Sequence, residues 1–189
     1  MVAEDKPIGT RVAGGISSAS HQAHQRDAGD VHFRPIRPDD WHRLQLFHLR
    51  LSAATVARRF HGAKRELSAP LAHRFTDIDG RDNAAWVATT GTRGRIVGVA
   101  RYFRLSPTSA EVAFVVEDGY QHWGVGRRLM DRLRGTALEK GITDFVAEVL
   151  PTNTGMLRLL RQAGPIEVRR EPDAWEVRVD MTREPAPPA

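Results

Sequence analysis

The sequence predicts a single α/β (α+β) domain, with a mixed, mostly antiparallel central sheet and helices on both of its faces. Apolar residues recur at mostly helical spacing over residues 41–51, whereas β-forming residues take over from Ala84 onward. Three strand-like segments then follow one another directly, as in an antiparallel meander. The next strand-like segment is reached only across an amphipathic helix, a connection typical of parallel neighbours. The chain length of 189 residues suits one such domain.

The first part of the chain is expected to supply a flexible leader, an edge strand and three helices. Residues 1–30 lack apolar periodicity, so they have little apolar surface with which to offset the entropy of ordering. The folded domain should cover residues 31–182, followed by a loose tail at 183–189. Residues 31–36 alternate like a strand, and Pro35 favours a sheet edge. The three helices are expected to begin after Asp40, Ser52 and Ser68.

The second part of the chain is expected to form most of the sheet and two further helices. Residues 124–139 place apolar side chains on one face and arginines on the other, and Gly141 suits the end of that helix. Another helix should begin at Asn153, whose side chain can cap it, and stop at Gly164. The expected strands are residues 85–88, 96–103, 110–116, 142–150, 167–169 and 175–179.

Composition narrows the partners and the chemistry open to the chain. Lys and Arg total 28 against 23 Asp and Glu, and this net charge of +5 favours anionic partners without choosing between a nucleotide phosphate, an acidic protein surface and nucleic acid. The chain has no cysteine, which excludes disulfides, thiolate metal sites and a cysteine nucleophile. No apolar run approaches the roughly 18–20 residues that span a bilayer, and the first residues lack a signal-peptide pattern. We therefore expect a cytoplasmic protein without a membrane partner.

A glycine-containing loop between a predicted strand and a predicted helix is the main candidate for a binding site. Its residues are Gln121-His122-Trp123-Gly124-Val125-Gly126. Glycines let a ligand approach the backbone closely, and the unpaired N–H groups of a first helical turn favour an anion such as a diphosphate. Arg127 and Arg128 can add positive charge, although one of them can equally face solvent. The Lys-Ser/Thr pair of a Walker A loop is missing, and the preceding strands form a meander rather than a dinucleotide-binding βαβ unit.

This loop matches the (Gln/Arg)-x-x-Gly-x-(Gly/Ala) signature of GNAT acetyltransferases, and residues 31–181 resemble that family in the order of their elements. The resemblance implies acetyl-CoA as co-substrate and no metal. It implies that the amides from His122 to Arg127 hold the pyrophosphate, and that Val115 and Val116 offer backbone groups to the pantetheine arm. Asn153 matches an asparagine that commonly contacts the cofactor, and an ordinary helix N-cap explains it equally well. The implied cofactor-binding residues are Val115, Val116, Gln121, His122, Trp123, Gly124, Val125, Gly126, Arg127 and Asn153.

A second pattern resembles one branch of this family, the bacterial protein lysine acetyltransferases that modify acyl-CoA synthetases. The residues that carry it are Leu51-Ser52, Arg59-Phe60-His61, Leu71, Phe75-Thr76, Asp79 and Ala84. The resemblance implies that the acceptor is a primary amine on a protein lysine, for example on an acyl-CoA synthetase.

Glu111 is the candidate general base. It opens a predicted strand and shares a face with Ala113 and Val115 by alternation. A lysine amine has a pKa of about 10.4, so only roughly one in a thousand is neutral at pH 7, and a carboxylate can take its proton before attack on the thioester. By the resemblance Glu111 corresponds to the base of protein lysine acetyltransferases, and a surface glutamate at a strand end is the alternative. Glu117 shares the face and ranks second, because a carboxylate near the pyrophosphate would repel it.

Leu160 marks a departure from the family pattern. Many GNATs place a tyrosine at this position, seven residues beyond the helix-opening asparagine, where it protonates the departing thiolate. A thiol pKa of about 8.5 lets the thiolate of CoA leave unassisted or be protonated through water. The same departure leaves room for a protein that binds acyl-CoA as a sensor without catalysing transfer.

Three functions therefore stay open: acetylation of a protein lysine with Glu111 as base, acetylation of a small-molecule amine, and non-catalytic sensing of acyl-CoA. An open acidic groove would favour a protein or polyamine acceptor, whereas a closed apolar pocket would favour a small molecule. Nucleic-acid binding through the arginines of residues 127–134 is disfavoured, because no aromatic residues are interleaved with them.

Overall fold

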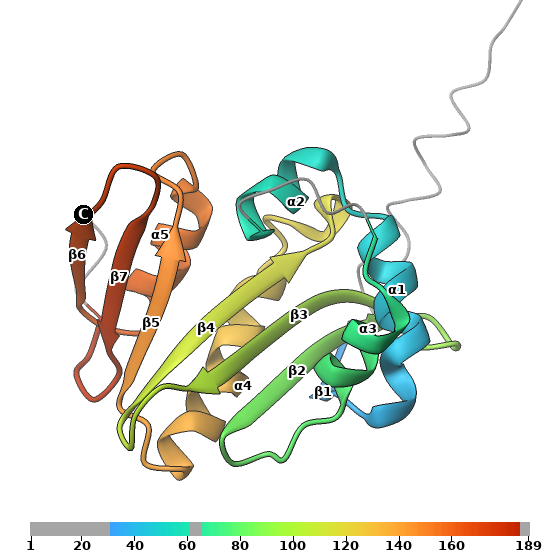
Figure 1. The fold of residues 1–189 in the computed structure, drawn as a ribbon, viewed down its shortest axis with the longest axis horizontal. Helices are drawn as coiled ribbons and strands as arrows, with labels where there is room; N and C mark the ends of the chain where they lie inside the picture. Colours follow the sequence, from blue (N-terminus) through green and yellow to red (C-terminus); the bar gives the residue numbers. More distant parts are fainter. Residues whose placement is uncertain (1–30, 61–65, 186–189) are drawn as a thin grey trace, which may run out of the picture.

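Seven strands form one sheet in the computed structural model, which describes residues 31–60 and 66–185 (Figure 1). The strands are β1 (His32–Pro35), β2 (Asn83–Thr90), β3 (Arg95–Arg104), β4 (Ser109–Val116), β5 (Asp144–Val149), β6 (Ile166–Arg170) and β7 (Trp175–Asp180). The helices are α1 (Trp41–Leu49), α2 (Ala53–Phe60), α3 (Ala69–Thr76), α4 (Val125–Glu139) and α5 (Thr154–Arg161), with short 3-10 turns η2 (Pro38–Asp40) and η3 (Asp118–Tyr120). The predicted leader, residues 1–30, lies outside the described residues, as do His61 and residues 186–189 of the predicted tail.

The strand order is β1-β2-β3-β4-β5-β7-β6, and every neighbouring pair is antiparallel except β4 and β5, which run parallel. The crossover helix α4 connects these two strands and packs against β2 and β3, while α1 lies over β3 on the opposite face (Figure 1). This mixed, mostly antiparallel sheet with helices on both faces confirms the predicted fold class.

The parallel ladder between β4 and β5 is short. Ser109, Ala110 and Glu111 pair with residues 144–146, and the pairing ends there although β4 continues to Val116. The two strands diverge beyond this point (Figure 1). One edge of β4 is therefore left without a strand partner over residues 112–116, which creates room for a ligand.

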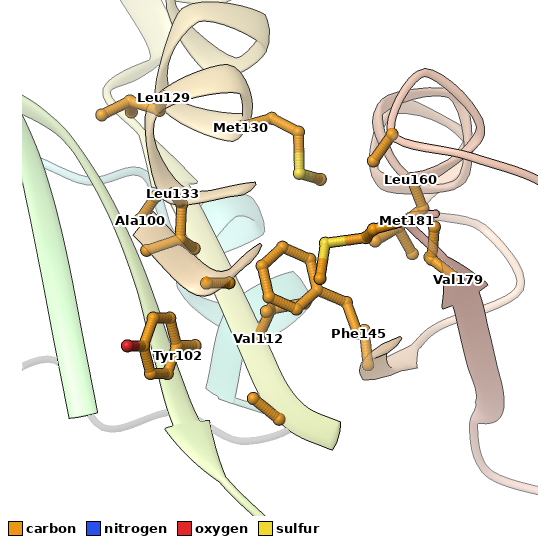
Figure 2. Packing of buried hydrophobic residues seen from close by; sticks show 14 of the residues in the cluster. Ala100, Tyr102, Val112, Leu129, Met130, Leu133, Phe145, Leu160, Val179 and Met181 are labelled. Carbon is orange, nitrogen blue, oxygen red and sulfur yellow. The ribbon is translucent and has the colours of Figure 1, made fainter. Parts of the chain in front are cut away.

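A shared hydrophobic core joins the strands on either side of this divergence. Figure 2 shows the ring of Phe145 from β5 directed toward Val112 of β4 and lying beside Met181. Met130 of α4 and Leu160 of α5 belong to the same cluster, and both are almost fully buried. A second cluster on the other face of the sheet packs α1–α3 against β2 and β3. Side-chain packing therefore holds the two strands together below the open end.

Across the described part of the chain, every helix is too short or too polar to traverse a lipid bilayer.

Candidate functional site

A cleft of about 470 Å³ opens between the end of β4 and the start of α5. Its lining residues are Thr55, Phe114, Val115, Val116, Gln121, His122, Gly124, Gly126, Arg127, Thr152, Asn153, Thr154, Gly155, Met156, Arg158, Leu159 and Gln162. The cleft thus brings together all of the predicted cofactor-binding residues except Trp123 and Val125. The Trp123 side chain is 56% exposed, and the Val125 side chain is buried in the core, so Val125 has only its backbone to offer.

The loop before α4 presents main-chain N–H groups to this cleft. Gly124 has φ of +75°, a left-handed conformation that favours glycine, and His122 also has a positive φ of +64°. α4 begins at Val125, and the first hydrogen bond of the helix runs from the Arg128 amide to the Gly124 carbonyl over 3.0 Å. The amides of residues 125–127 therefore have no acceptor within the helix, and they lie at the positive end of its dipole.

The open edge of β4 adds a second set of main-chain groups. Hydrogen-bonded pairs alternate along an antiparallel ladder, and the Glu117 amide bonds to the Val97 carbonyl at 2.9 Å. By this alternation the backbone of Val115 is paired with β3, while the N–H and C=O groups of Phe114 and Val116 point toward the cleft. The prediction that the Val115 backbone meets the pantetheine arm is therefore wrong, although Val115 lines the cleft and packs against the second hydrophobic cluster. The backbone partners for an extended ligand are thus Phe114 and Val116.

Two arginines from different helices flank the cleft. Arg127 of α4 and Arg158 of α5 both line it, both are exposed, and neither has an ion-pair partner among the described residues. Arg128 lies instead over the ring of Phe33, with its guanidinium carbon 4.3 Å from the ring centroid. Of the two arginines that follow the loop, Arg127 is therefore the one that adds charge to the cleft.

Glu111 is exposed and lies where β4 and β5 stop pairing. It stands opposite Phe103 on β3 and Val146 on β5, so its two cross-strand neighbours are apolar. It is not among the residues that line the cleft, and its role as base stays a prediction. Glu117, the second candidate, forms ion pairs with Arg50 and Arg95, which gives this carboxylate a structural role.

Comparison with known protein families matches residues 44–164 to the acetyltransferase (GNAT) family. The chain belongs to the GNAT family. Acetyl-CoA is the acetyl donor of this family, and the predicted enzyme class, an acetyl-CoA-dependent N-acetyltransferase, is confirmed at the level of the family.

The chain is similar to two curated acetyltransferases. The chain is similar to the acetyltransferase Pat of Mycolicibacterium smegmatis, with 34% identity over 152 residues, covering 79% of this chain and 45% of Pat. It is also similar to the acetyltransferase PA5475 of Pseudomonas aeruginosa, with 31% identity over 154 residues, covering 80% of this chain and 83% of that protein. The chain thus spans less than half the length of Pat.

Among solved structures, the GNAT domain of S. lividans PAT aligns with a TM-score of 0.73 and 34% identity, covering 79% of this chain and 90% of that domain. A cAMP-binding acyltransferase from Mycobacterium smegmatis aligns with a TM-score of 0.57 and 31% identity, covering 84% of this chain and 46% of that chain. The predicted resemblance to protein acetyltransferases within the GNAT family is confirmed by these relatives.

Leu160, which stands where many GNATs have a tyrosine, is part of the hydrophobic core. Leu160 is fully buried in the first hydrophobic cluster, beside Val179 and Met181 (Figure 2). The titratable side chains that line the cleft in the described residues are His122, Arg127 and Arg158. Within the described residues, no three metal-binding side chains gather in one place.

Asn153 has the capping role that was one of its two interpretations. Its side-chain oxygen accepts a hydrogen bond from the Met156 amide at 3.1 Å, and the residue also lines the cleft. Capping is therefore confirmed, and contact with the cofactor stays a prediction.

Sequence reasoning missed several lining residues. Met156 and Leu159 follow Asn153 at three-residue spacing, which places all three on one side of α5, so that helical periodicity was the available signal. Thr55 offers no such signal, because it reaches the cleft only through the docking of α2.

Proposed function

We propose that this chain transfers an acetyl group from acetyl-CoA, bound in the cleft, to the side-chain amine of a protein lysine. The observation that carries the proposal is the set of main-chain groups around the cleft that have no partner within the sheet or the helix. Of these groups, the Val116 carbonyl accepts one hydrogen bond, from the Gln121 side chain. The amides of residues 125–127 suit a pyrophosphate at a helix N-terminus. Phe114 and Val116 suit an extended pantetheine arm, which can pair with the open edge of β4 like an added strand.

The chemistry follows from a bound thioester beside Glu111. Glu111 takes a proton from the acceptor ammonium, directly or through water, and the neutral amine attacks the thioester carbonyl. A carbon–nitrogen bond forms, the carbon–sulfur bond breaks, and the thiolate of CoA leaves without a side-chain acid. The second proton of the attacking amine passes through water to the thiolate, which gives the amide and free CoA thiol. Backbone N–H groups on the open edge of β4 stabilise the oxyanion, since donors fixed in advance need no reorganisation.

The outer face of the sheet beside Glu111 supports a protein as acceptor. Along β7 and β6, Glu176, Arg178 and Glu167 are exposed on the face that carries Glu111, and the described helices leave this face uncovered. An open and partly acidic surface admits a lysine on a large partner, whereas a small-molecule site usually encloses its ligand. The relatives named Pat and PAT are further support.

Transfer of labelled acetyl from acetyl-CoA to an acyl-CoA synthetase tests the reaction. We expect the synthetase to be labelled on lysine, and we expect Glu111→Gln to lower kcat by at least about 100-fold while CoA affinity stays unchanged. Glu139→Gln, which alters an exposed glutamate at the far end of α4, is the matched control and should behave like wild type. Full activity in Glu111→Gln would remove this residue as the base. If small amines are labelled but no protein is, the acceptor is a small-molecule amine and not a protein lysine.

The buried Leu160 favours one second candidate, a module that binds acyl-CoA without turnover. This candidate predicts that CoA binds in the cleft, as calorimetry would detect, while no amine or protein causes release of free CoA thiol. A thiol-release screen across amines and candidate proteins separates the two functions.

A further inference from the structure

The end of β4 is held in place by Gln121, the first residue of the signature loop, as we call residues 121–126. The Gln121 side-chain amide donates to the Val116 carbonyl at 3.0 Å, and the next amide along the chain, that of Glu117, donates to Val97 at 2.9 Å. The peptide that joins Val116 to Glu117 is therefore fixed at both its carbonyl and its N–H group. This matters because β4 has no strand partner on the cleft side over residues 112–116.

Gln121 is in turn held by a threonine on another element. Its amide nitrogen lies 3.3 Å from the Thr55 hydroxyl oxygen, and that hydroxyl donates to the Asp118 carboxylate at 2.9 Å. Thr55 is only 6% exposed and lines the cleft. Since its proton is directed at Asp118, its lone pairs are left to accept from Gln121, which fixes the orientation of both side chains.

Asp118 anchors the start of α2 at the same point. The Ser52 amide and hydroxyl donate to its two carboxylate oxygens at 3.1 and 2.7 Å. Although partial burial disfavours its charge, these hydrogen bonds and the one from Thr55 hold the pKa of Asp118 below its ordinary value. A carboxylate at the N-terminal end of a helix is also favoured by the helix dipole. The Ser52 and Thr55 positions thus have a shared partner in the turn just before the signature loop.

We propose that Thr55 is a positioning residue for the acetyl-CoA site. Through Gln121 it fixes the Val116 carbonyl, and so keeps the open edge of β4 in the geometry that pairs with the cofactor. The proposal rests on the proposed function in one respect, namely that the cleft binds acetyl-CoA. In this proposal Thr55 acts through Gln121 and not on the reacting atoms, so its loss should weaken cofactor binding more than it slows chemistry at saturation.

The pair Thr55→Val and Thr55→Ser tests this role. Valine keeps the shape of threonine but lacks the hydroxyl, whereas serine keeps the hydroxyl. We expect Thr55→Val to raise the Kd for CoA and the KM for acetyl-CoA by about five- to tenfold, because it removes two hydrogen bonds that each contribute modestly. The KM for the acceptor should stay unchanged. Thr55→Ser should restore near-wild-type values.

Thr136→Val is the matched control for a general loss of stability. Thr136 also makes two hydrogen bonds, accepting from the Trp86 indole at 3.0 Å and donating to the Arg132 carbonyl at 3.0 Å, and it is not among the cleft residues. It should lower the Tm without changing the Kd for CoA, which calorimetry measures on all variants.

Each outcome distinguishes the two proposals. If wild type binds CoA and Thr55→Val binds it equally well, with or without a lower Tm, Thr55 is merely structural and the inference fails. If Thr55→Ser is as impaired as Thr55→Val, the hydroxyl is not the cause and the inference fails again. If wild type itself does not bind CoA, the proposed function fails first.

Discussion

The two halves of the sheet differ in how many of their faces are covered, and the candidate cleft lies where they meet. β2 and β3 are buried on both faces, because α4 packs on one side and α1–α3 pack on the other. Along β5 and β7 buried residues alternate with partly or fully exposed ones, because one face is covered and the other is open to solvent. The halves share a ladder of only three residue pairs, between β4 and β5.

This difference assigns separate tasks to the two halves. The half that contains β2 and β3 supplies β4, the signature loop and α4. The half with one open face supplies α5 to the cleft and an accessible surface beside Glu111 to the acceptor. Because the backbone ladder between them stops early, the side-chain core around Phe145 has to hold the halves in register while the cleft edges remain unpaired.

Phe145→Ala should have the largest effect of the substitutions that probe this junction. Truncating a buried phenylalanine costs about 3–5 kcal/mol in the free energy of unfolding, and the cavity here would lie between the halves. We also expect the Kd for CoA to rise by about tenfold, since β5 and α5 lose their support against β4. Urea unfolding and calorimetry would measure the two effects.

Phe47→Ala is the comparison variant. Phe47 is as buried as Phe145, but it lies on α1 and belongs to the second hydrophobic cluster. It should lose a similar amount of stability and keep the wild-type affinity for CoA at a temperature where both variants are folded. Equal CoA affinity in the two variants would show that the junction core does not shape the cleft.

The contrast between the halves was largely visible in the sequence. β3 contains an almost unbroken run of apolar residues, as expected for a strand buried on both faces, whereas Trp175, Val177 and Val179 of β7 alternate with charged residues. The signature loop was equally visible, since glycines and a following amphipathic helix are local features. Local patterns therefore predicted the fold class and the side of the cleft that is formed by the end of β4 and the signature loop.

What the sequence could not predict depends on contacts between distant segments. Thr55 meets Gln121 across 66 positions of the chain, and nothing near Thr55 distinguishes it from an ordinary residue in a first helical turn. Arg158 looks like a solvated arginine on a short helix until α5 is placed beside the cleft. The alternation of β4 gave Glu111 its face correctly, but only the register with β5 shows that it stands where the strands part.

Asp40→Asn should lower the stability by less than Phe145→Ala does. Its effect should depend on pH, and this dependence tests a buried carboxylate in the half that contains β2 and β3. Asp40 is fully buried at the start of α1, and it accepts hydrogen bonds from Arg34 at 2.6 and 2.7 Å and from the Arg37 amide at 2.9 Å. Burial disfavours its charge, but these partners hold the pKa of Asp40 below its ordinary value. Removing the charge should cost about 2–3 kcal/mol at pH 7, since Arg34 then loses its buried counter-ion.

The pH dependence follows from the sign of that pKa shift. A carboxylate whose pKa is lowered by folding stabilises the protein above the unfolded pKa of about 3.9, and it loses that contribution as the pH falls through the folded value. The Tm difference between wild type and Asp40→Asn should therefore be constant from pH 8 to about 5 and shrink below about pH 4. Asp180→Asn, on the half with one open face, is the control: hydrogen bonds from Thr182 lower its pKa too, but its carboxylate is solvated. A Tm difference that grows on acidification would contradict the assigned sign.

Arg127→Gln and Arg158→Gln should have the smallest effects, and they ask whether both halves contribute to binding the anionic cofactor. Arg127 belongs to the helix that covers β2 and β3, and Arg158 belongs to α5, which shares a hydrophobic cluster with β5. Both arginines nevertheless line the cleft without an ion-pair partner in the described residues. Their exposure means that solvent screens their attraction to a phosphate, so each substitution should weaken CoA binding only about three- to tenfold at low salt. Calorimetry between about 50 and 500 mM salt should show the salt dependence of the Kd reduced in each variant and further reduced in the double variant.

Arg128→Gln is the control on the same helix, because the Arg128 guanidinium lies over Phe33, and it should leave the Kd unchanged. If only Arg127→Gln weakens binding, the electrostatic attraction to the cofactor comes from α4 alone. In that case α5 contributes only apolar lining, through Met156 and Leu159.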